Sequence, residues 1–194
     1  MNTEQQTWTE EIKSQESLFS VKLKEVWQYR DLLFMLVKRD YVTVYKQTIL
    51  GPIWFFIQPM LTTLVYVILF GKLAGLSTDG TPQIAFYLAG ITIWNYFSKS
   101  LTKTSTVFKD NAAMMGKVYF PRLIMPLSIV VSALMKFGIQ FALFLAAVLY
   151  FTFVEGSIRP SSWILATPFL LLLMASFSLG LGMIFSSLDT KYKY

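Results

Sequence analysis

The chain has 194 residues, of which 55% are hydrophobic and only 14% charged, and its formal net charge is +6. Soluble domains carry about 25% charged residues, and a domain this poor in charge would expose large apolar patches to water, so the composition excludes soluble and disordered proteins and indicates an integral membrane protein. The sequence has no Cys and no His, which excludes a disulfide framework, a thiol nucleophile, Ser-His-Asp chemistry and the usual catalytic zinc sites.

The first 48 residues precede any stretch long enough to span a membrane. Residues 1–17 are polar and mixed in charge, unlike a removable signal peptide, and are expected to form a cytoplasmic N-terminus. Residues 18–48 repeat apolar side chains at helical spacing, with charged residues largely elsewhere around the helix. We expect an amphipathic helix that lies in the plane of the cytoplasmic interface or packs on the protein's own cytoplasmic parts. The residues assigned to this interface helix are Trp27, Arg30, Phe34, Arg39, Tyr41 and Tyr45.

Four stretches nearly free of charge follow, and each is long enough to cross about 30 Å of hydrocarbon. They predict a membrane domain over residues 49–188, and the spans are placed at about 49–71, 84–101, 123–153 and 161–188. Residues 189–194 begin a cytoplasmic loop. The predicted fold class is therefore all-α integral membrane, with the interface helix followed by four transmembrane helices.

Basic residues predict the orientation of these spans. With the N-terminus inside, segments 1–48, 99–122 and 189–194 are cytoplasmic and hold seven, five and two Lys or Arg residues. The two outside loops hold one each, Lys72 and Arg159. This asymmetry follows the positive-inside rule and places both ends of the given chain in the cytoplasm. The alternative meaning of a basic chain, binding to nucleic acid, is rejected because the charges lie between apolar runs rather than on one polar surface.

Lys136 interrupts the third predicted span. A charge at that depth costs about 2.5–3.5 kcal/mol on insertion scales, so we expect it to face the protein interior, a polar cavity or an acidic partner. No acid of the chain is expected at matching depth, since Asp79 and Glu155 fall in the predicted outside loops. One hypothesis is that Lys136 attracts an anionic group such as a lipid pyrophosphate. The alternative is that it snorkels or is neutralised by carbonyl groups or further helices.

The first predicted span contains Gln58-Pro59. An interior proline predicts a kink or a freed carbonyl group at this point. Gln58 is expected either to line a polar path or to hydrogen-bond a neighbouring helix. Aromatic residues such as Trp54 and Trp94 lie near the predicted span ends, where an interfacial aromatic belt would explain them without any function.

The predicted inside segment 99–122 contains signals for a short helix. Asp110 and Asn111 are suited to cap it, residues 112–115 favour it, and Gly116 is suited to end it. A short cytoplasmic helix between two spans suits docking onto a soluble partner; the alternative is an ordinary basic loop.

Catalysis by this chain is not expected. The acidic residues near the membrane are scattered singly rather than clustered for acid–base or metal chemistry, so no catalytic or metal-binding residue is assigned. There is also no G-x-x-x-x-G-K-[ST] motif for binding ATP.

Two segments resemble one family. Residues 39–54, RDYVTVYKQTILGPIW, followed by Gln58-Pro59, are similar to the start of polysaccharide-exporting ATP-binding-cassette permeases. Residues 118–127, VYFPRLIMPL, resemble the same family's entry into its third span. The family exports O-antigen, capsule or teichoic-acid chains on lipid carriers.

The resemblance implies a six-span permease that works as a homodimer in the bacterial inner membrane. Two separate ATPase subunits would bind ATP and magnesium, so no cofactor is expected in this chain. The sugar polymer would pass between the two permeases. The resemblance also implies an ATPase-coupling helix made of Asp110, Asn111, Ala112, Ala113, Met114, Met115 and Gly116. The candidate substrate path comprises Trp54, Phe55, Gln58, Tyr66, Trp94 and Lys136.

The given chain ends at residues 189–194, which resemble the family's inside loop before the fifth span, so four of the six spans are expected in it. Two alternatives to polysaccharide export remain. One is an exporter of drugs or small lipids with the same permease fold, and the other is a non-transporting membrane scaffold or inactive fragment.

Overall fold

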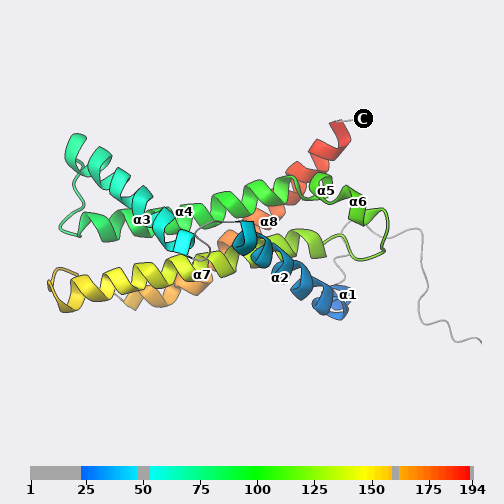
Figure 1. The fold of residues 1–194 in the computed structure, drawn as a ribbon, viewed down its shortest axis with the longest axis horizontal. Coiled ribbons are helices and arrows are strands. Elements are labelled where there is room, and N and C mark those ends of the chain that lie inside the picture. The colour runs from blue at the N-terminus through cyan, green and yellow to red at the C-terminus, as the bar shows by residue number, and fades with distance from the viewer. Residues whose placement is uncertain (1–22, 48–52, 159–161, 193–194) are drawn as a thin grey trace, which may run out of the picture.

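The chain folds into an elongated bundle of helices. The computed structural model describes residues 23–47, 53–158 and 162–192, and these residues contain helices and no β-strand. The main elements are α1 (Leu23–Gln28), α2 (Arg30–Gln47), α3 (Trp54–Tyr66), η2 (Val67–Leu73), α4 (Gln83–Ser105), α5 (Val107–Asp110), α6 (Ala112–Met115), α7 (Ile124–Phe153), η3 (Ser162–Ala166) and α8 (Thr167–Tyr192). Helices α5 and α6 lie at one end of the bundle, here called the α6 end, and the loops after η2 and α7 lie at the other (Figure 1). The predicted all-α membrane fold is confirmed.

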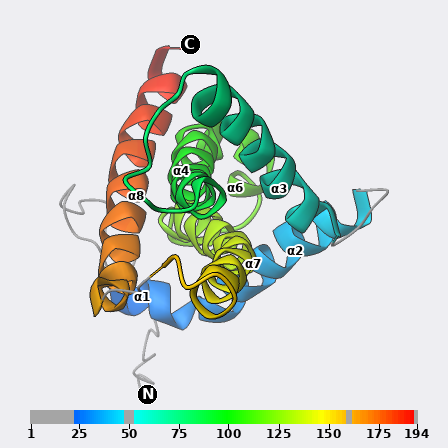
Figure 2. The ribbon, with the colours of Figure 1, turned by 90° about the vertical axis from the view of Figure 1, so that its left-hand side faces the viewer.

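Three helices among the described residues are long and apolar enough to cross a membrane: Trp54–Leu73, Ile124–Phe153 and Ile164–Asp189. They correspond to the predicted spans at 49–71, 123–153 and 161–188. The remaining predicted span, 84–101, falls on α4, which has 23 residues but is less apolar. Viewed along the bundle, α4 lies in the middle, with α3, α7 and α8 around it (Figure 2). Neighbouring helices therefore cover much of its polar surface, as membrane proteins require, and its role as a span stays a prediction.

Helices α4 and α8 pack through small and polar residues. The hydroxyl oxygens of Ser100 and Ser178 are 3.0 Å apart, and both side chains are buried. One turn along, Gly182 meets Thr104 so closely that a Cβ atom on the glycine would lie 2.5 Å from the Cβ atom of Thr104. One further turn along, the backbone N–H of Phe108 donates to the hydroxyl oxygen of Ser186 at 3.3 Å. Small residues allow this close approach, and the hydrogen bonds satisfy polar atoms away from water.

Helix α3 continues through Pro59 as an α-helix and then becomes the π-helix η2. Thr62 and Thr63 donate their hydroxyl hydrogens to the carbonyl oxygens of Gln58 and Pro59, at 2.9 and 2.7 Å. Both hydroxyls bond the carbonyl four residues earlier, which satisfies these polar side chains within the helix itself. The two elements together make a candidate membrane helix, Trp54–Leu73, which overlaps the predicted span at about 49–71.

An apolar cluster at the α6 end joins α2 to the rest of the bundle. Its buried members are Leu36, Val107, Phe120, Ile124 and Met125. The expected interface helix is therefore packed on the protein's own segments, which was the second of the two alternatives. Its apolar residues do not form one face, however, because Trp27 and Phe34 are 70% and 69% exposed while Leu36 and Val37 are buried. The exposed pair remains available to the membrane interface.

Candidate functional site

A large groove, open on one side, lies between α3, α4 and α7, in the half of the bundle away from α6. Its volume is about 730 Å³, and η3 and the loop after α7 complete its wall. Its aromatic lining residues are Tyr66, Phe86, Tyr87, Trp94 and Phe144. We call this space the aromatic chamber.

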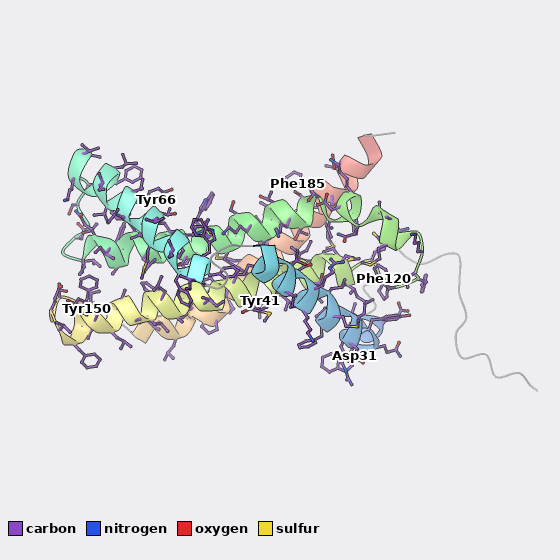
Figure 3. The ribbon with its side chains drawn as sticks, viewed as in Figure 1. Asp31, Tyr41, Tyr66, Phe120, Tyr150 and Phe185 are labelled. Atoms are coloured by element: carbon purple, nitrogen blue, oxygen red, sulfur yellow. The ribbon has the colours of Figure 1, made fainter. Side chains whose placement is uncertain are left out.

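The rings of the chamber come from separate elements that pack edge to face. Tyr66 of α3 and Tyr87 of α4 have ring centroids 6.4 Å apart at an interplanar angle of 85°. Figure 3 shows Tyr66 on α3 and Tyr150 on α7, both toward the end of the bundle opposite Phe120. Trp94 is 65% exposed and so presents most of its indole to the space around it. Aromatic faces of this kind combine a large apolar area with limited conformational freedom.

Of the predicted path residues, Tyr66 and Trp94 meet in the chamber, whereas Trp54, Phe55 and Gln58 do not line it. These three lie in the first turns of α3, and Tyr66 ends that helix. Twelve residues of helix separate Trp54 from Tyr66, or about 18 Å at 1.5 Å per residue. Sequence reasoning missed Phe86, Tyr87 and Phe144, because aromatic residues are common throughout the predicted spans and nothing local distinguishes these three.

Lys136 lines a second, smaller cavity between α2, α4 and α7, with a volume of about 40 Å³. The expectation that Lys136 faces a polar cavity agrees with this position. The expectation that no acid lies at its depth is wrong, because Asp40 of α2 lines the same cavity. Asp40 was assigned to a helix outside the membrane spans, and only the packing of α2 on α7 brings it into this cavity. We call this space the lysine cavity.

Two polar stripes meet in the lysine cavity. Helix α4 contributes Asn95, Lys99 and Lys103, and α7 contributes Ser132, Lys136 and Gln140. In each helix the three residues are spaced by four, which places them on one face. This spacing was a readable signal in the sequence, since each stripe puts polar residues at regular intervals into an apolar helix.

Asn95 lines both cavities. The lysine cavity and the aromatic chamber are therefore neighbours along α4, with Lys103 near the α6 end and Tyr87 toward the opposite end. A polar region rich in lysine is thus followed by an aromatic region, along one helix.

The predicted interface-helix residues differ in their surroundings. Arg30 lies over the ring of Trp27, with its guanidinium carbon 5.7 Å from the indole centroid, which is a cation–π distance. Arg39 pairs with Asp40 at 3.2 Å. Tyr41 is half-buried, Phe34 is exposed, and the side chain of Tyr45 lies outside the described residues.

The predicted coupling segment forms a one-turn helix, α6, immediately after α5. Ala112, Ala113 and Gly116 are exposed, whereas Met114 and Met115 pack against the apolar cluster that holds α2. The predicted caps form differently. The Asn111 amide donates back to the carbonyl oxygen of Val107 at 2.9 Å, and the Asp110 carboxylate accepts from the hydroxyl of Thr106 at 2.7 Å. Neither side chain caps α6, since both are used to bond the preceding helix α5.

Comparison with known proteins agrees with this architecture. The model of the ABC-2 type transporter family matches residues 31–193. An O-antigen export system permease protein RfbA of Klebsiella pneumoniae is 29% identical over 175 residues, which cover 90% of this chain and 65% of the relative. A protein of the same name from Myxococcus xanthus is 30% identical over 172 residues, 88% of this chain and 63% of the relative. The chain thus spans slightly less than two thirds of the length of these relatives. Since the family model matches nearly the whole chain, this protein belongs to the ABC-2 type transporter family.

Proposed function

We propose that this chain forms the membrane path of an ATP-driven exporter that moves a lipid-linked polysaccharide across the bacterial cytoplasmic membrane. The aromatic chamber carries this proposal, because it combines a large volume with rings from three helices. The names of the relatives, which are O-antigen export permeases, support a polysaccharide over other cargo. O-antigen, capsule and teichoic-acid chains are the candidate substrates.

The chamber provides a surface suited to sugars. Carbohydrate rings have apolar faces that stack on aromatic side chains, and polar edges that need hydrogen-bonding partners. Among the lining residues, Thr62, Thr81 and Asn95 provide such polar groups beside the rings. A wall of this composition would contact many sugar units of the chain without binding any one unit tightly. Such weak contacts suit movement of the polysaccharide across the membrane.

Energy is proposed to come from a separate ATPase subunit that binds ATP and magnesium. Helix α6 is the proposed docking element, since Ala112 and Ala113 are exposed at the end of the bundle. Met114 and Met115 connect α6 to the cluster that contains Leu36 of α2 and Ile124 of α7. A push on α6 would therefore reach both the interface helix and the start of α7. A second copy of the permease is proposed to complete the path.

The proposed orientation places the α6 end in the cytoplasm. Lys103, Lys109, Lys117 and Arg122 all lie at or near this end of the described chain, as expected for cytoplasmic segments. The lysine cavity then lies on the cytoplasmic side of the aromatic chamber. Cargo with an anionic lipid group would meet basic residues before aromatic ones.

Reconstitution in vesicles tests the function. The complete permease and its ATPase would be inserted with a fluorescent lipid-linked glycan, and accessibility of the glycan to an added glycosidase would be followed with and without ATP. ATP-dependent movement of the glycan supports the proposal. Movement that is equal without ATP, or none at all with an active ATPase, refutes it.

An exporter of drugs or small lipids is the second candidate, favoured by an apolar cavity of about 300 Å³. This cavity also lies between α3, α4 and α7, and residues such as Met60, Leu88 and Leu143 line it. Small apolar substrates should then compete with glycan transport or replace it. A non-transporting scaffold is the remaining alternative, and it would neither bind nor stimulate an ATPase on co-purification.

A further inference from the structure

The lysine cavity contains hydroxyl and ammonium groups without a partner among the described residues. It is lined from three elements: Asp40 of α2, the polar stripe of α4 together with Tyr96, and the polar stripe of α7. Its volume of about 40 Å³ accommodates roughly three waters or one compact oxyanion.

Two hydroxyl groups in this lining are buried and have no partner. Tyr96 and Ser132 are 2% and 7% exposed, and neither the Tyr96 Oη atom nor the Ser132 Oγ atom makes a hydrogen bond. Buried polar atoms in native proteins are nearly always paired with protein, water or a ligand. Two unpaired donors in the wall of one cavity therefore point to an occupant that accepts hydrogen bonds.

The charged residues of the cavity indicate that this occupant is negatively charged. Lys99, Lys103 and Lys136 line it, and among the described residues none of these three ammonium groups forms an ion pair. The one carboxylate in the lining, on Asp40, is paired with Arg39 at 3.2 Å. Lys136 is half-buried, whereas Lys99 and Lys103 are exposed. The cavity thus holds an excess of positive charge, which an anion would neutralise.

We propose that the lysine cavity is a binding site for a phosphate group. Tyr96 and Ser132 donate hydrogen bonds to its oxygens from α4 and α7, and the three lysines neutralise its charge. Phosphate fits better than chloride or a carboxylate, because its several oxygens can accept from donors on two helices at once. Lysine binds phosphate as a point charge and does not need a fixed bidentate geometry. Asp40 opposes binding, since its carboxylate lies in the same lining.

This inference deepens the proposed function, on which it rests only for the origin of the phosphate. The group belongs either to a lipid head group or to free inorganic phosphate. Binding needs no ATP, no ATPase and no transport, so failure of the vesicle assay leaves the site intact and failure of binding leaves export intact.

Native mass spectrometry of the purified chain tests the site, because bound phosphate and bound lipid differ in mass. One arm adds inorganic phosphate, and the other places the chain in phosphatidylcholine nanodiscs with and without phosphatidic acid. Saturable binding in the first arm identifies free phosphate, and binding confined to the second identifies a lipid head group. No saturable binding in either arm refutes the proposal.

Four variants separate this site from unspecific attraction to basic residues. Lys136→Met should weaken binding by at least about tenfold, because it removes a desolvated charge beside the anion. Tyr96→Phe keeps the ring and should weaken binding by about fivefold, the value of one hydrogen bond. Asp40→Asn should strengthen binding, since it removes the opposing charge. Lys72→Met, in η2 and outside the lining, should leave binding unchanged.

The opposite signs make the test decisive even if one variant folds poorly. A defect in folding would weaken binding in all three cavity variants, whereas the proposal requires Asp40→Asn to bind more tightly. If Asp40→Asn weakens binding, or if Lys72→Met weakens it as much as Lys136→Met, the site is not as described.

Discussion

Single side chains in this protein are explained by what the tertiary structure places around them. Lys136 lies near the middle of α7, a helix long enough to span a membrane. A charge at that depth must be surrounded by polar groups. The structure provides them from α2, α4 and α7 together. Trp94 lies on the same helix as Asn95, and it contributes its exposed ring to the aromatic chamber. Neighbouring residues on α4 thus line two different spaces, the aromatic chamber and the lysine cavity.

Trp94→Ala is expected to reduce ATP-driven glycan export by about twofold to tenfold, since one aromatic stacking contact contributes about 0.5–1.5 kcal/mol. Trp94→Phe keeps an aromatic face and should retain most of the export. The measurement is the initial transport rate in vesicles. The control is Ile93→Ala, which changes the neighbouring residue, also exposed, that does not line the chamber. If Ile93→Ala and Trp94→Ala lower the rate equally, the ring has no special role.

Pairs of helices pack through small and polar residues that recur every four positions. Helices α4 and α8 meet through Ser178 and Gly182, and Ser186, four residues further along α8, bonds to Phe108 of α5. In a membrane such contacts depend on close packing and on hydrogen bonds worth about 0.6 kcal/mol each, because lipid is as apolar as the side chains. The fit around Gly182 is therefore expected to matter for stability.

Gly182→Ala should destabilise the protein by about 1–3 kcal/mol, because the new Cβ atom would lie 2.5 Å from Thr104 and the helices would have to separate. Gly180→Ala is the matched control, since nothing lies within 4 Å of its added Cβ atom. Thermal unfolding in detergent compares the two. Equal melting temperatures for both variants would contradict the close packing of α4 on α8.

Helix α6 provides a second test at the scale of an element. Ala113→Glu adds a charge to an exposed position, so it should leave the melting temperature unchanged while it uncouples ATP hydrolysis from glycan export. Ala113→Ser, a small polar change, should retain coupling. The measurements are ATPase stimulation and transport by the reconstituted complex. Normal export by Ala113→Glu would remove α6 from the proposed ATPase interface.

The whole molecule has two different ends. Helices α5 and α6 lie at one end with several basic residues, and the loops after η2 and α7 lie at the other (Figure 1). Orientation in the membrane then decides which end can meet the proposed ATPase, because ATP is in the cytoplasm. The chain has no Cys, so a single introduced cysteine reports on one position only.

Ala113→Cys should be protected from a membrane-impermeant maleimide in intact cells, and should react after the membrane is permeabilised. Glu155→Cys, exposed in the loop after α7, should react in intact cells. The expectation follows from the distribution of basic residues. The reverse labelling pattern would invert the topology and remove the proposed ATPase docking.

Much of the element structure was predictable from the sequence, because hydrophobic length is a local property. The span at 161–188 required only a count of residues without charge, and the span at 123–153 only the tolerance of one lysine, since lipid sets a minimum apolar length for every span. The polar stripe of Ser132, Lys136 and Gln140 was also readable as a helical spacing. By contrast, the capping predicted for Asn111 was wrong, because its side chain bonds back to α5.

The sequence by itself determined that this is a helical membrane protein, and its residues 39–54 and 118–127 already indicated the family. It did so through hydrophobicity, length and local motifs, which need no knowledge of neighbouring helices. Only the tertiary structure decided that Asp40 and Lys136 line one cavity, that Tyr66 and Trp94 share one chamber, and that Trp54 lies outside it. These contacts join distant segments, and they depend on how α2 and α3 pack across α4 and α7, which no local pattern specifies.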